Sequence, residues 1–420
     1  MTWVLLAVSV VFFVITLNSF HPVRRNRVLF VPSFFLSWLT NELAPFYSVV
    51  TVLVGGLVVV GVGAVESWVE VVTLGFLAAT LALLVVIWAR GRAAAPEVAK
   101  ALADFGDGQS RVTRSRRRHY QRTRDVEFAR AGGRRLKLDV IEPSERGEKR
   151  PAILQIHGGG WVIGDKREQG WPLLKYLASN GWVGFNANYR LSPGATWPDH
   201  LVDCKRALAW IRANADDYGV DPDFVVVTGG SAGGHLTAMM ALTANDPQYQ
   251  PGFRMPDTTV QAAVPFYGVY DFTDRYGTQV PEMRAWVLEP LVMKAFFDDE
   301  PEKFAAASPM DQVHRDAPPF LVVHGTKDTL APVADAREFV RMLRDSSRHQ
   351  VFYVELEGAQ HAFDIFSSPR TRRVVRGVER FLFGVWDAYA SDREGELHPP
   401  DKGSRAPDES ARGPETHAVG

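Results

Sequence analysis

A serine, an aspartate and a histidine in the second half of the chain have the side-chain types needed for nucleophilic catalysis. Ser231 lies in a G-x-S-x-G sequence (229–233), Asp328 in an H-G-T-K-D sequence (324–328) and His361 in a G-A-Q-H-A-F sequence (358–363). A serine hydroxyl becomes a nucleophile when an imidazole takes its proton and a carboxylate orients that imidazole. Asp335 is a competing carboxylate, but its surroundings predict the interior of a helix.

A glycine-rich segment supplies a second chemical feature. His157 is followed by three glycines and Trp161, directly after an apolar run that ends at Ile156. Consecutive glycines let backbone N–H groups point into a cavity, where they stabilise a developing oxyanion. The alternative is an ordinary flexible turn, although a histidine and three glycines at a strand end favour the oxyanion role.

Each of these residues follows a short apolar run, and longer helix-like stretches lie between the runs. Repetition of strand and helix predicts an α/β fold with a mainly parallel central sheet, in which sites lie beyond the carboxyl ends of the strands. A hairpin around the glycine pair 132–133 is expected to precede the parallel strands. The expected parallel strands are 152–156, 182–187, 224–227, 260–264, 320–323 and 351–354, and the expected helices are 201–213, 235–243, 333–343 and 371–383.

The order serine, aspartate, histidine, each after a separate strand, is that of α/β-hydrolases. With the sequence N-Y-R-L-S-P at 188–193, residues from about 120 to 385 resemble the hormone-sensitive-lipase-type esterases. With its apolar amino-terminal region, the whole chain most resembles the membrane-anchored carboxylesterases of mycobacteria and related actinobacteria. One departure is Gly230, where that branch usually has aspartate. At this position the chain is more similar to the related feruloyl-esterase-like and kynurenine-formamidase-like members.

The resemblance implies a role for each candidate residue. Ser231 attacks an ester carbonyl, His361 takes its proton, and Asp328 orients the imidazole and stabilises its charged form. The oxyanion is held by the N–H groups of Gly158, Gly159 and Ala232, and water then hydrolyses the acyl-enzyme. No cofactor and no metal are expected.

The first ninety residues are almost entirely apolar and predict about three membrane-spanning helices in the runs 3–17, 45–65 and 71–89. The shorter run 28–39 contains Pro32 and is expected to lie at the interface, with Trp38 at the headgroup level. Basic residues follow the first and third runs but not the second. The positive-inside rule therefore predicts a multi-pass protein of the plasma (inner) membrane, with the amino terminus outside and the catalytic domain in the cytoplasm.

The expected boundaries are a transmembrane region (1–92), a basic linker (93–120), a catalytic domain (121–388) and a disordered tail (389–420). The linker's arginines at 111–118 would either contact anionic headgroups or form a solvated connector. An insertion at 268–311 carries apolar residues that would form either a lid over an acyl pocket or simply core.

The net charge of −1 over 420 residues does not indicate nucleic-acid binding. The expected partners are a small-molecule or lipid ester and, through the amino-terminal helices, membrane lipids; the oligomeric state is left open. Three functions remain in competition. They are a membrane-anchored serine carboxylesterase or lipase acting on hydrophobic esters, an amidase or acyltransferase that uses the same acyl-enzyme, and a non-catalytic membrane scaffold that binds lipid or a protein partner.

Overall fold

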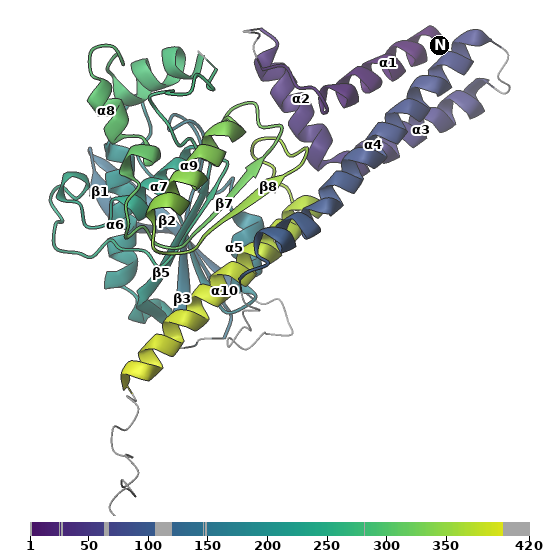
Figure 1. The fold of residues 1–420 in the computed structure, drawn as a ribbon. Coiled ribbons are helices and arrows are strands. Elements are labelled where there is room, and N and C mark those ends of the chain that lie inside the picture. Colours follow the sequence, from purple (N-terminus) through teal and green to yellow (C-terminus); the bar gives the residue numbers. More distant parts are fainter. Residues whose placement is uncertain are drawn as a thin grey trace, which may run out of the picture.

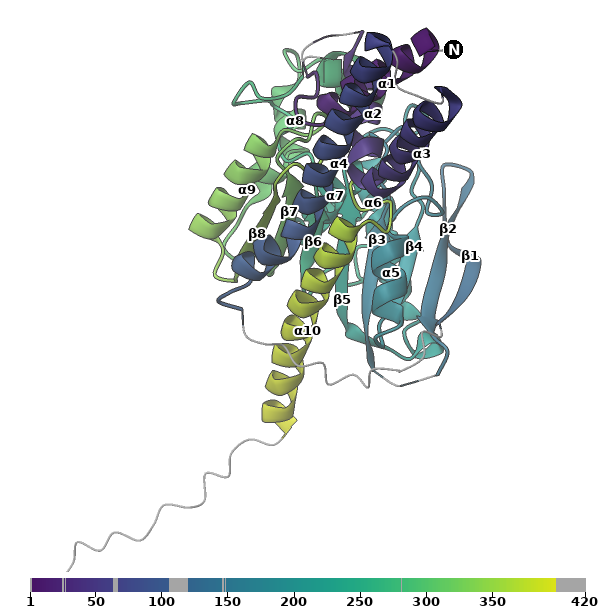
Figure 2. The same ribbon diagram turned by 90° about the vertical axis from the view of Figure 1, so that its right-hand side faces the viewer.

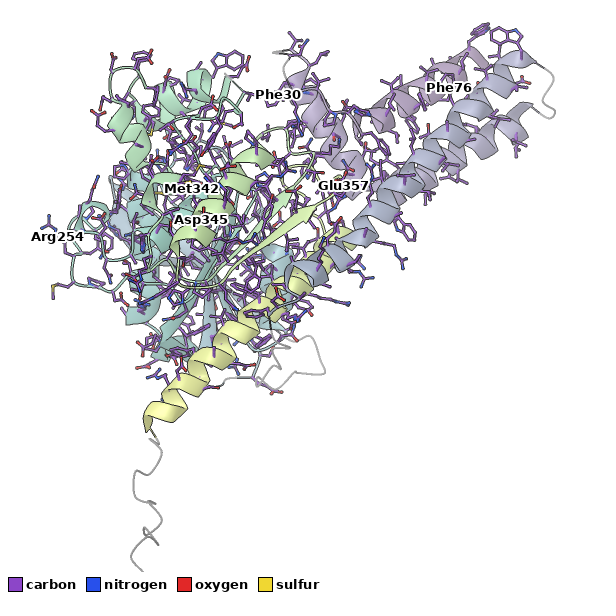
Figure 3. The ribbon with its side chains drawn as sticks, in the orientation of Figure 1. Phe30, Phe76, Arg254, Met342, Asp345 and Glu357 are labelled. Atoms are coloured by element: carbon purple, nitrogen blue, oxygen red, sulfur yellow. The ribbon has the colours of Figure 1, made fainter. Side chains whose placement is uncertain are left out.

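The computed structural model describes residues 2–24, 26, 28–62, 67–105, 120–145, 147, 149–280 and 282–397. Figure 1 shows two regions: an α/β body built on a central sheet, and a group of amino-terminal helices that projects from it. One of these helices, α2 (Phe30–Glu42), lies between the projecting group and the body. In Figure 3, Phe76 marks the projecting group, whereas Glu357 lies where that group meets the body.

The central sheet has eight strands in the order β1-β2-β4-β3-β5-β6-β7-β8. The predicted hairpin is confirmed, because β1 and β2 pair antiparallel on either side of the glycine turn. β2 also pairs antiparallel with β4, and every later pairing is parallel. The strands are β1 (Tyr120–Ala131), β2 (Arg134–Pro143), β3 (Arg150–Ile156), β4 (Val183–Ala187), β5 (Val220–Gly230), β6 (Ala263–Phe266), β7 (Phe320–Gly325) and β8 (Val351–Leu356).

Helices cover both faces of this sheet, and alternate residues of the buried strands enter two different cores. Val225 and Val227 of β5 belong to one core and Val226 to the other, as the two-residue period of a strand requires. On the first face lie α6 (Asp199–Ala213), α7 (Ala232–Leu242) and α9 (Val333–Ser346); on the second lie α5 (Trp171–Ala178) and α10 (Pro369–Leu397). The mostly parallel sheet with flanking helices is the one expected from sequence.

The insertion after β6 contains short helical elements rather than one continuous helix. They are the π-helix η3 (Met283–Met293), α8 (Pro301–Ala306) and the short η4 (Pro309–Gln312); two single turns, η1 (Asp216–Tyr218) and η2 (Pro247–Tyr249), lie earlier in the chain. In η3, Leu288, Val292 and Met293 are fully buried in the first core, whereas Trp286 remains 56% exposed. One side of the insertion is therefore core, as one of the two interpretations has it, whereas a lid over an acyl pocket stays a prediction.

The amino-terminal region consists of α1 (Thr2–Asn18), α2, α3 (Ala44–Val62) and α4 (Trp68–Ala101). Among the described residues, α4 is the one helix long and apolar enough to cross a membrane. The pair α2 and α3, bent by 89° at its break, would add a second span if the pair acts as one. α1 is apolar but shorter. Three spans and the orientation derived from them stay a prediction.

Two expected boundaries are wrong. Residues 93–101 do not begin a linker, because α4 continues to Ala101 and buries Ala94 and Val98 against the second core. At the other end, α10 continues past residue 388 to Leu397. The arginine-rich segment 111–118 and the tail beyond residue 397 lie outside the described residues. The last turns of α4 thus pack directly against α10 and β8 of the α/β body (Figure 2).

Candidate active site

Ser231 is the single residue between the end of β5 and the start of α7. Its backbone has φ 60° and ψ −123°, a conformation rarely adopted by a residue with a side chain. The turn is held because the Ser231 N–H donates to Phe266 O (3.0 Å) and the Ser231 carbonyl accepts from His235 N (2.9 Å). The serine is partly exposed, whereas α7 behind it is buried. Strain of this kind is found where a side chain must be presented at a functional site.

Gly230, the position that departs from the family pattern, lies against the ring of Tyr267. A Cβ at residue 230 would lie 2.5 Å from the Tyr267 hydroxyl oxygen, so any side chain there requires the ring to move. The Tyr267 hydroxyl donates to a carboxylate oxygen of Asp364, and the ring centroid lies 4.6 Å from that of His361. Burial and the neighbouring carboxylate hold the pKa of Tyr267 well above its ordinary value, so the phenol stays protonated and donates. Tyr267 therefore contacts both the serine turn and the histidine.

His361 and Asp328 are brought together by the loops that follow β8 and β7. The His361 Nδ1 atom lies 2.7 Å from Asp328 Oδ2, and both side chains are buried. The other Asp328 oxygen accepts from the N–H groups of Leu330 (2.9 Å) and Ala331 (2.8 Å). Burial alone would raise the pKa of Asp328, but His361 and His324 outweigh it and hold the pKa below its usual range. The carboxylate is thus ionised and fixed in place beside the imidazole.

The competing carboxylate, Asp335, has a different environment. It lies in the first turn of α9, where one of its oxygens accepts a hydrogen bond from the Thr278 hydroxyl. Burial raises its pKa to about 6. Of the two aspartates, the structure places Asp328 against His361.

Ser231 is at the same edge of the sheet, but it is not hydrogen-bonded to His361 in this structure. Within the described part of the chain, the Ser231 Oγ atom makes no hydrogen bond with His361. Catalytic hydrogen bonds are often long before substrate binds. The shared neighbour Tyr267 shows that the serine turn and the histidine loop adjoin each other.

Gln360 joins the aspartate loop to the histidine loop, a role that sequence reasoning missed. Its side-chain oxygen accepts from Thr329 N (2.9 Å) and from the N–H of His361 (2.9 Å). Gln360 itself is fully buried. It sits directly before the histidine in the sequence, and this adjacency is the only sequence signal that pointed to it.

The glycine loop after β3 lies beside the serine, but one of its amides is already paired. A Cβ on Gly158 would lie 3.0 Å from Ser231 Cβ, which places this loop at the turn. The Gly158 N–H, however, donates to the side-chain oxygen of Gln169 (2.7 Å). Among the described residues, the N–H groups of Gly159, Gly160 and Ala232 have no such acceptor. The expectation that Gly158 is an oxyanion donor is therefore corrected, because its N–H is occupied by Gln169.

Gly159 and Gly160 adopt backbone conformations that favour glycine, with φ of 120° and 59°. A Cβ on Gly159 would lie 2.1 Å from the carbonyl oxygen of Ile163, so the loop's tight turn excludes a side chain at this position. The sequence signal of three glycines thus reflects a real backbone requirement.

Buried aromatic contacts hold this loop against α7. The Trp161 indole N–H donates to His235 Nδ1 (3.3 Å), and the other nitrogen of His235 bonds the carbonyl of Ala307 (2.8 Å). Burial lowers the pKa of His235 to about 3, so this histidine is neutral and structural. His157 stacks on Tyr189 (ring centroids 4.4 Å apart), and the Tyr189 hydroxyl donates to the carbonyl of His157 (3.0 Å). The N-Y-R-L-S-P sequence therefore supports the glycine loop.

The amino-terminal helix α2 forms a wall beside the histidine, which sequence reasoning did not anticipate. The Phe34 ring meets the His361 ring edge-on at 6.3 Å, and the Trp38 indole donates to the carbonyl of Ala362 (2.9 Å). Trp38, expected at the level of lipid headgroups, thus contacts the histidine loop. At the end of α2, Glu42 forms a buried ion pair with Arg370 at the start of α10. No spacing in the sequence links residue 34 to residue 361.

Apolar side chains border the site on two sides. Val287 of η3 approaches within 3.9 Å of a Cβ built on Gly160, and Phe34 stands beside His361. Ile163 in the glycine loop and Phe296 after η3 are exposed, at 69% and 66%. Among the described residues, no group of histidine, cysteine, aspartate or glutamate side chains is arranged to hold a metal ion.

The α/β body matches a known family, and known esterases are similar to the body or to nearly the whole chain. Residues 138–343 match the BD-FAE family. The chain is 40% identical over 420 residues to a probable carboxylic ester hydrolase, LipM, of Mycobacterium tuberculosis, covering 93% of this chain and 94% of LipM. It is 45% identical over 283 residues to the esterase LipQ of the same organism, covering 67% of this chain and 66% of LipQ. At 93% of this chain, the match to LipM reaches into the amino-terminal helices as well as the body.

Among solved structures, the body is similar to Est2, a thermophilic esterase from Thermogutta terrifontis. The two share 25% sequence identity with a TM-score of 0.52, over 67% of this chain and 94% of Est2.

Proposed function

The chain belongs to the hormone-sensitive-lipase-like esterases of the α/β-hydrolase fold, and from that premise we propose that it is a membrane-anchored serine carboxylesterase acting on hydrophobic esters. It is a hydrolase that acts on ester bonds, as its relatives are. The observation that carries the finer proposal is the 2.7 Å contact of His361 Nδ1 with the ionised, buried Asp328, at the edge where Ser231 is presented.

In the proposed reaction, the Ser231 hydroxyl oxygen attacks the carbonyl carbon of the ester while His361 takes the hydroxyl proton. Asp328 holds the imidazole by its Nδ1–H and stabilises the positive charge that the ring acquires. His361 then returns the proton to the departing alcohol, which leaves an acyl-serine. His361 then takes a proton from a water molecule, whose oxygen attacks the acyl carbon; the acyl–serine bond breaks, His361 returns the proton to the Ser231 oxygen, and the carboxylic acid is released.

The negative charge on the carbonyl oxygen requires backbone donors, and each donor is worth about 10²–10³ in rate. We assign this role to the N–H groups of Gly159, Gly160 and Ala232. Gly160 thus replaces Gly158 in the set expected from sequence. The support is that these amides are without a protein acceptor among the described residues, whereas the Gly158 amide is not.

The preference for a hydrophobic ester rests on Phe34 and Val287, which border the histidine and the glycine loop. Membrane anchoring rests on the length and apolar character of α4 and on the bent pair α2 and α3. Because α2 contacts the histidine loop, the proposed anchor and the site belong to one structural unit.

Labelling of the full chain with a fluorophosphonate probe tests the catalytic proposal. Wild type and the control variant Ser179→Ala, which changes a partly exposed serine at the end of α5, are expected to be labelled equally. Ser231→Ala is expected to lose all labelling and at least 10³-fold in hydrolysis of p-nitrophenyl butyrate. Serine-independent labelling of folded Ser231→Ala would contradict the assignment.

The same protein distinguishes an esterase from an amidase or acyltransferase. A matched pair of a p-nitrophenyl ester and the corresponding anilide, with and without an added alcohol acceptor, separates the three by their products. We expect hydrolysis of the ester to dominate.

A further inference from the structure

Four arginines meet around a surface hollow where the apolar helix α4 joins the start of α10. The hollow has a volume of about 200 Å³ and is lined by Trp88, Arg92, Pro369, Arg372, Arg373 and Arg376. We call Arg92, Arg372, Arg373 and Arg376 the arginine cluster. It is assembled from segments about 280 residues apart in sequence, so no linear motif announces it. Figure 2 shows α4 lying against the beginning of α10, beneath the projecting helices.

The two helices can form this cluster because small residues let them approach closely. A Cβ on Gly377 would lie 2.1 Å from a methyl carbon of Val98, and a Cβ on Gly91 would lie 3.9 Å from Arg370 N. This contact fixes the separation of Arg92 from the three arginines of α10. The hollow is therefore a feature of the packed fold and not of one flexible side chain.

Carboxylates of the described part of the chain do not neutralise the cluster. Within the described residues, none of its four guanidinium groups forms an ion pair with a carboxylate, whereas the neighbouring Arg370 is paired with Glu42. The contacts they do make are with neutral groups: the Arg92 guanidinium lies over the Trp88 ring (4.7 Å), and Arg372 Nε donates to the carbonyl of Ser367 (3.1 Å). Four like charges around one hollow repel one another unless an anion lies among them.

The position of the cluster along α4 indicates which kind of anion binds there. Residues 71–89 of α4 carry no charge, and Trp88 with Arg92 marks the end of that stretch. Tryptophan and basic residues at the end of an apolar helix lie at the level of lipid headgroups, and basic clusters there attract anionic lipids. Trp88 is 41% exposed and offers an apolar surface beside the charges.

We propose that the arginine cluster binds the phosphate headgroup of an anionic phospholipid, with Trp88 against the upper part of its acyl chains. The proposal rests on the membrane anchoring put forward above, but it does not depend on the catalytic assignment. A bound headgroup would couple the membrane surface to α10, whose first turn also carries the Arg370 that is paired with α2.

The test uses the full chain in a neutral detergent, titrated with a short-chain phosphatidylglycerol, the matching phosphatidylcholine, or inorganic phosphate. We expect phosphatidylglycerol alone to raise the unfolding temperature in a concentration-dependent manner. Replacing all four arginines of the cluster by glutamine is expected to raise the half-saturating concentration of phosphatidylglycerol at least tenfold. The matched control is Arg337→Gln with Arg341→Gln, two surface arginines of α9 that are paired with carboxylates. The control is expected to respond as wild type does.

Three outcomes would overturn the proposal: an equal effect of both lipids, an unchanged response of the cluster variant, or an equal effect of inorganic phosphate. The last would assign the cluster to free phosphate and not to a lipid. If the fourfold variant does not fold, the pairs Arg92→Gln with Arg373→Gln and Arg372→Gln with Arg376→Gln each serve in its place. Hydrolysis of a soluble ester by the same preparations reports on the catalytic proposal separately, and we expect it to be unchanged in the cluster variants.

Discussion

Asp328 and Asp335 both follow β7, but their replacement by asparagine is expected to change different properties. Asp328→Asn should abolish most of the activity, whereas Asp335→Asn should increase the stability. Asp328→Asn removes the charge that lies 2.7 Å from His361 Nδ1, while the N–H groups of Leu330 and Ala331 keep the new side chain in place. The amide cannot stabilise an imidazolium and favours the wrong tautomer of the histidine. In a triad this substitution costs about 10⁴-fold in kcat. At 1.36 kcal/mol per factor of ten, that is about 5.4 kcal/mol of lost transition-state stabilisation.

Asp335→Asn is expected to leave kcat/KM within about twofold and to stabilise the protein. Burial raises the pKa of Asp335 from 3.8 to about 6, so the folded state binds its proton more tightly than the unfolded state does. The contribution of Asp335 to stability is therefore fully present below about pH 4 and is lost as the pH rises through 6. A shift of about two pKa units corresponds to about 3 kcal/mol at most. Asparagine carries no charge, so its advantage should grow between pH 4 and 6 and stay constant above.

Initial rates with p-nitrophenyl butyrate at pH 8, and urea unfolding at pH 4.5 and pH 8, measure both effects. The unfolding midpoint of Asp328→Asn checks that this variant is folded. The reasoning is refuted if Asp335→Asn causes the large loss of activity and Asp328→Asn does not. It is also refuted, in its electrostatic part, if Asp335→Asn stabilises the protein more at pH 4.5 than at pH 8.

Two further substitutions test the surroundings of the histidine. Gly230→Ala places a Cβ against the Tyr267 hydroxyl and should cost about 1–3 kcal/mol of stability together with activity. In a Tyr267→Ala background the cost of Gly230→Ala should be smaller, which denaturant unfolding of the two single variants and the double variant will show. Phe34→Ala removes an apolar wall beside His361 and should reduce kcat/KM about tenfold for long-chain esters but much less for the acetate. A uniform loss across a p-nitrophenyl ester series would contradict a role of Phe34 in chain-length preference.

The sequence predicted those parts of the molecule that depend on local pattern. The parallel strands were found because continuous β-branched runs bounded by glycine are diagnostic of buried strands, and the candidate residues were found because they follow such runs. α5 was missed: it has only eight residues, too few for a clear helical period. The ends of α4 and α10 were placed wrongly because both helices continue into charged sequence, and there tertiary packing decides the boundary.

Contacts between distant segments were beyond any local pattern. Gly230 was noticed as a departure from the family, but its physical reason, the ring of Tyr267, lies 37 residues away. The glycine loop was identified, yet which amides are free depends on Gln169, which had no motif. Likewise, nothing in the sequence connected α2 to the histidine loop. Candidate residues could therefore be predicted from their types and local sequence. Which backbone amides are free, and which side chains border the histidine, could not.

The contact between the amino-terminal helices and the body leads to a last prediction, that a catalytic domain cut at residue 119 will be unstable. Removing residues 1–119 deletes Glu42, the ion-pair partner of Arg370, together with the helices α2 and α4 that cover this arginine. In the full chain Arg370 is 1% exposed, and breaking its buried ion pair there costs about 3–5 kcal/mol, a large part of the stability of a typical domain. Deletion also uncovers the side of α10 that packs against Val98 and Phe105. We expect the truncated chain to aggregate or to be rapidly degraded by protease, and Glu42→Gln in the full chain to show a milder form of the same defect. A truncated chain as protease-resistant and active as the full chain would show that the helices are only a tether.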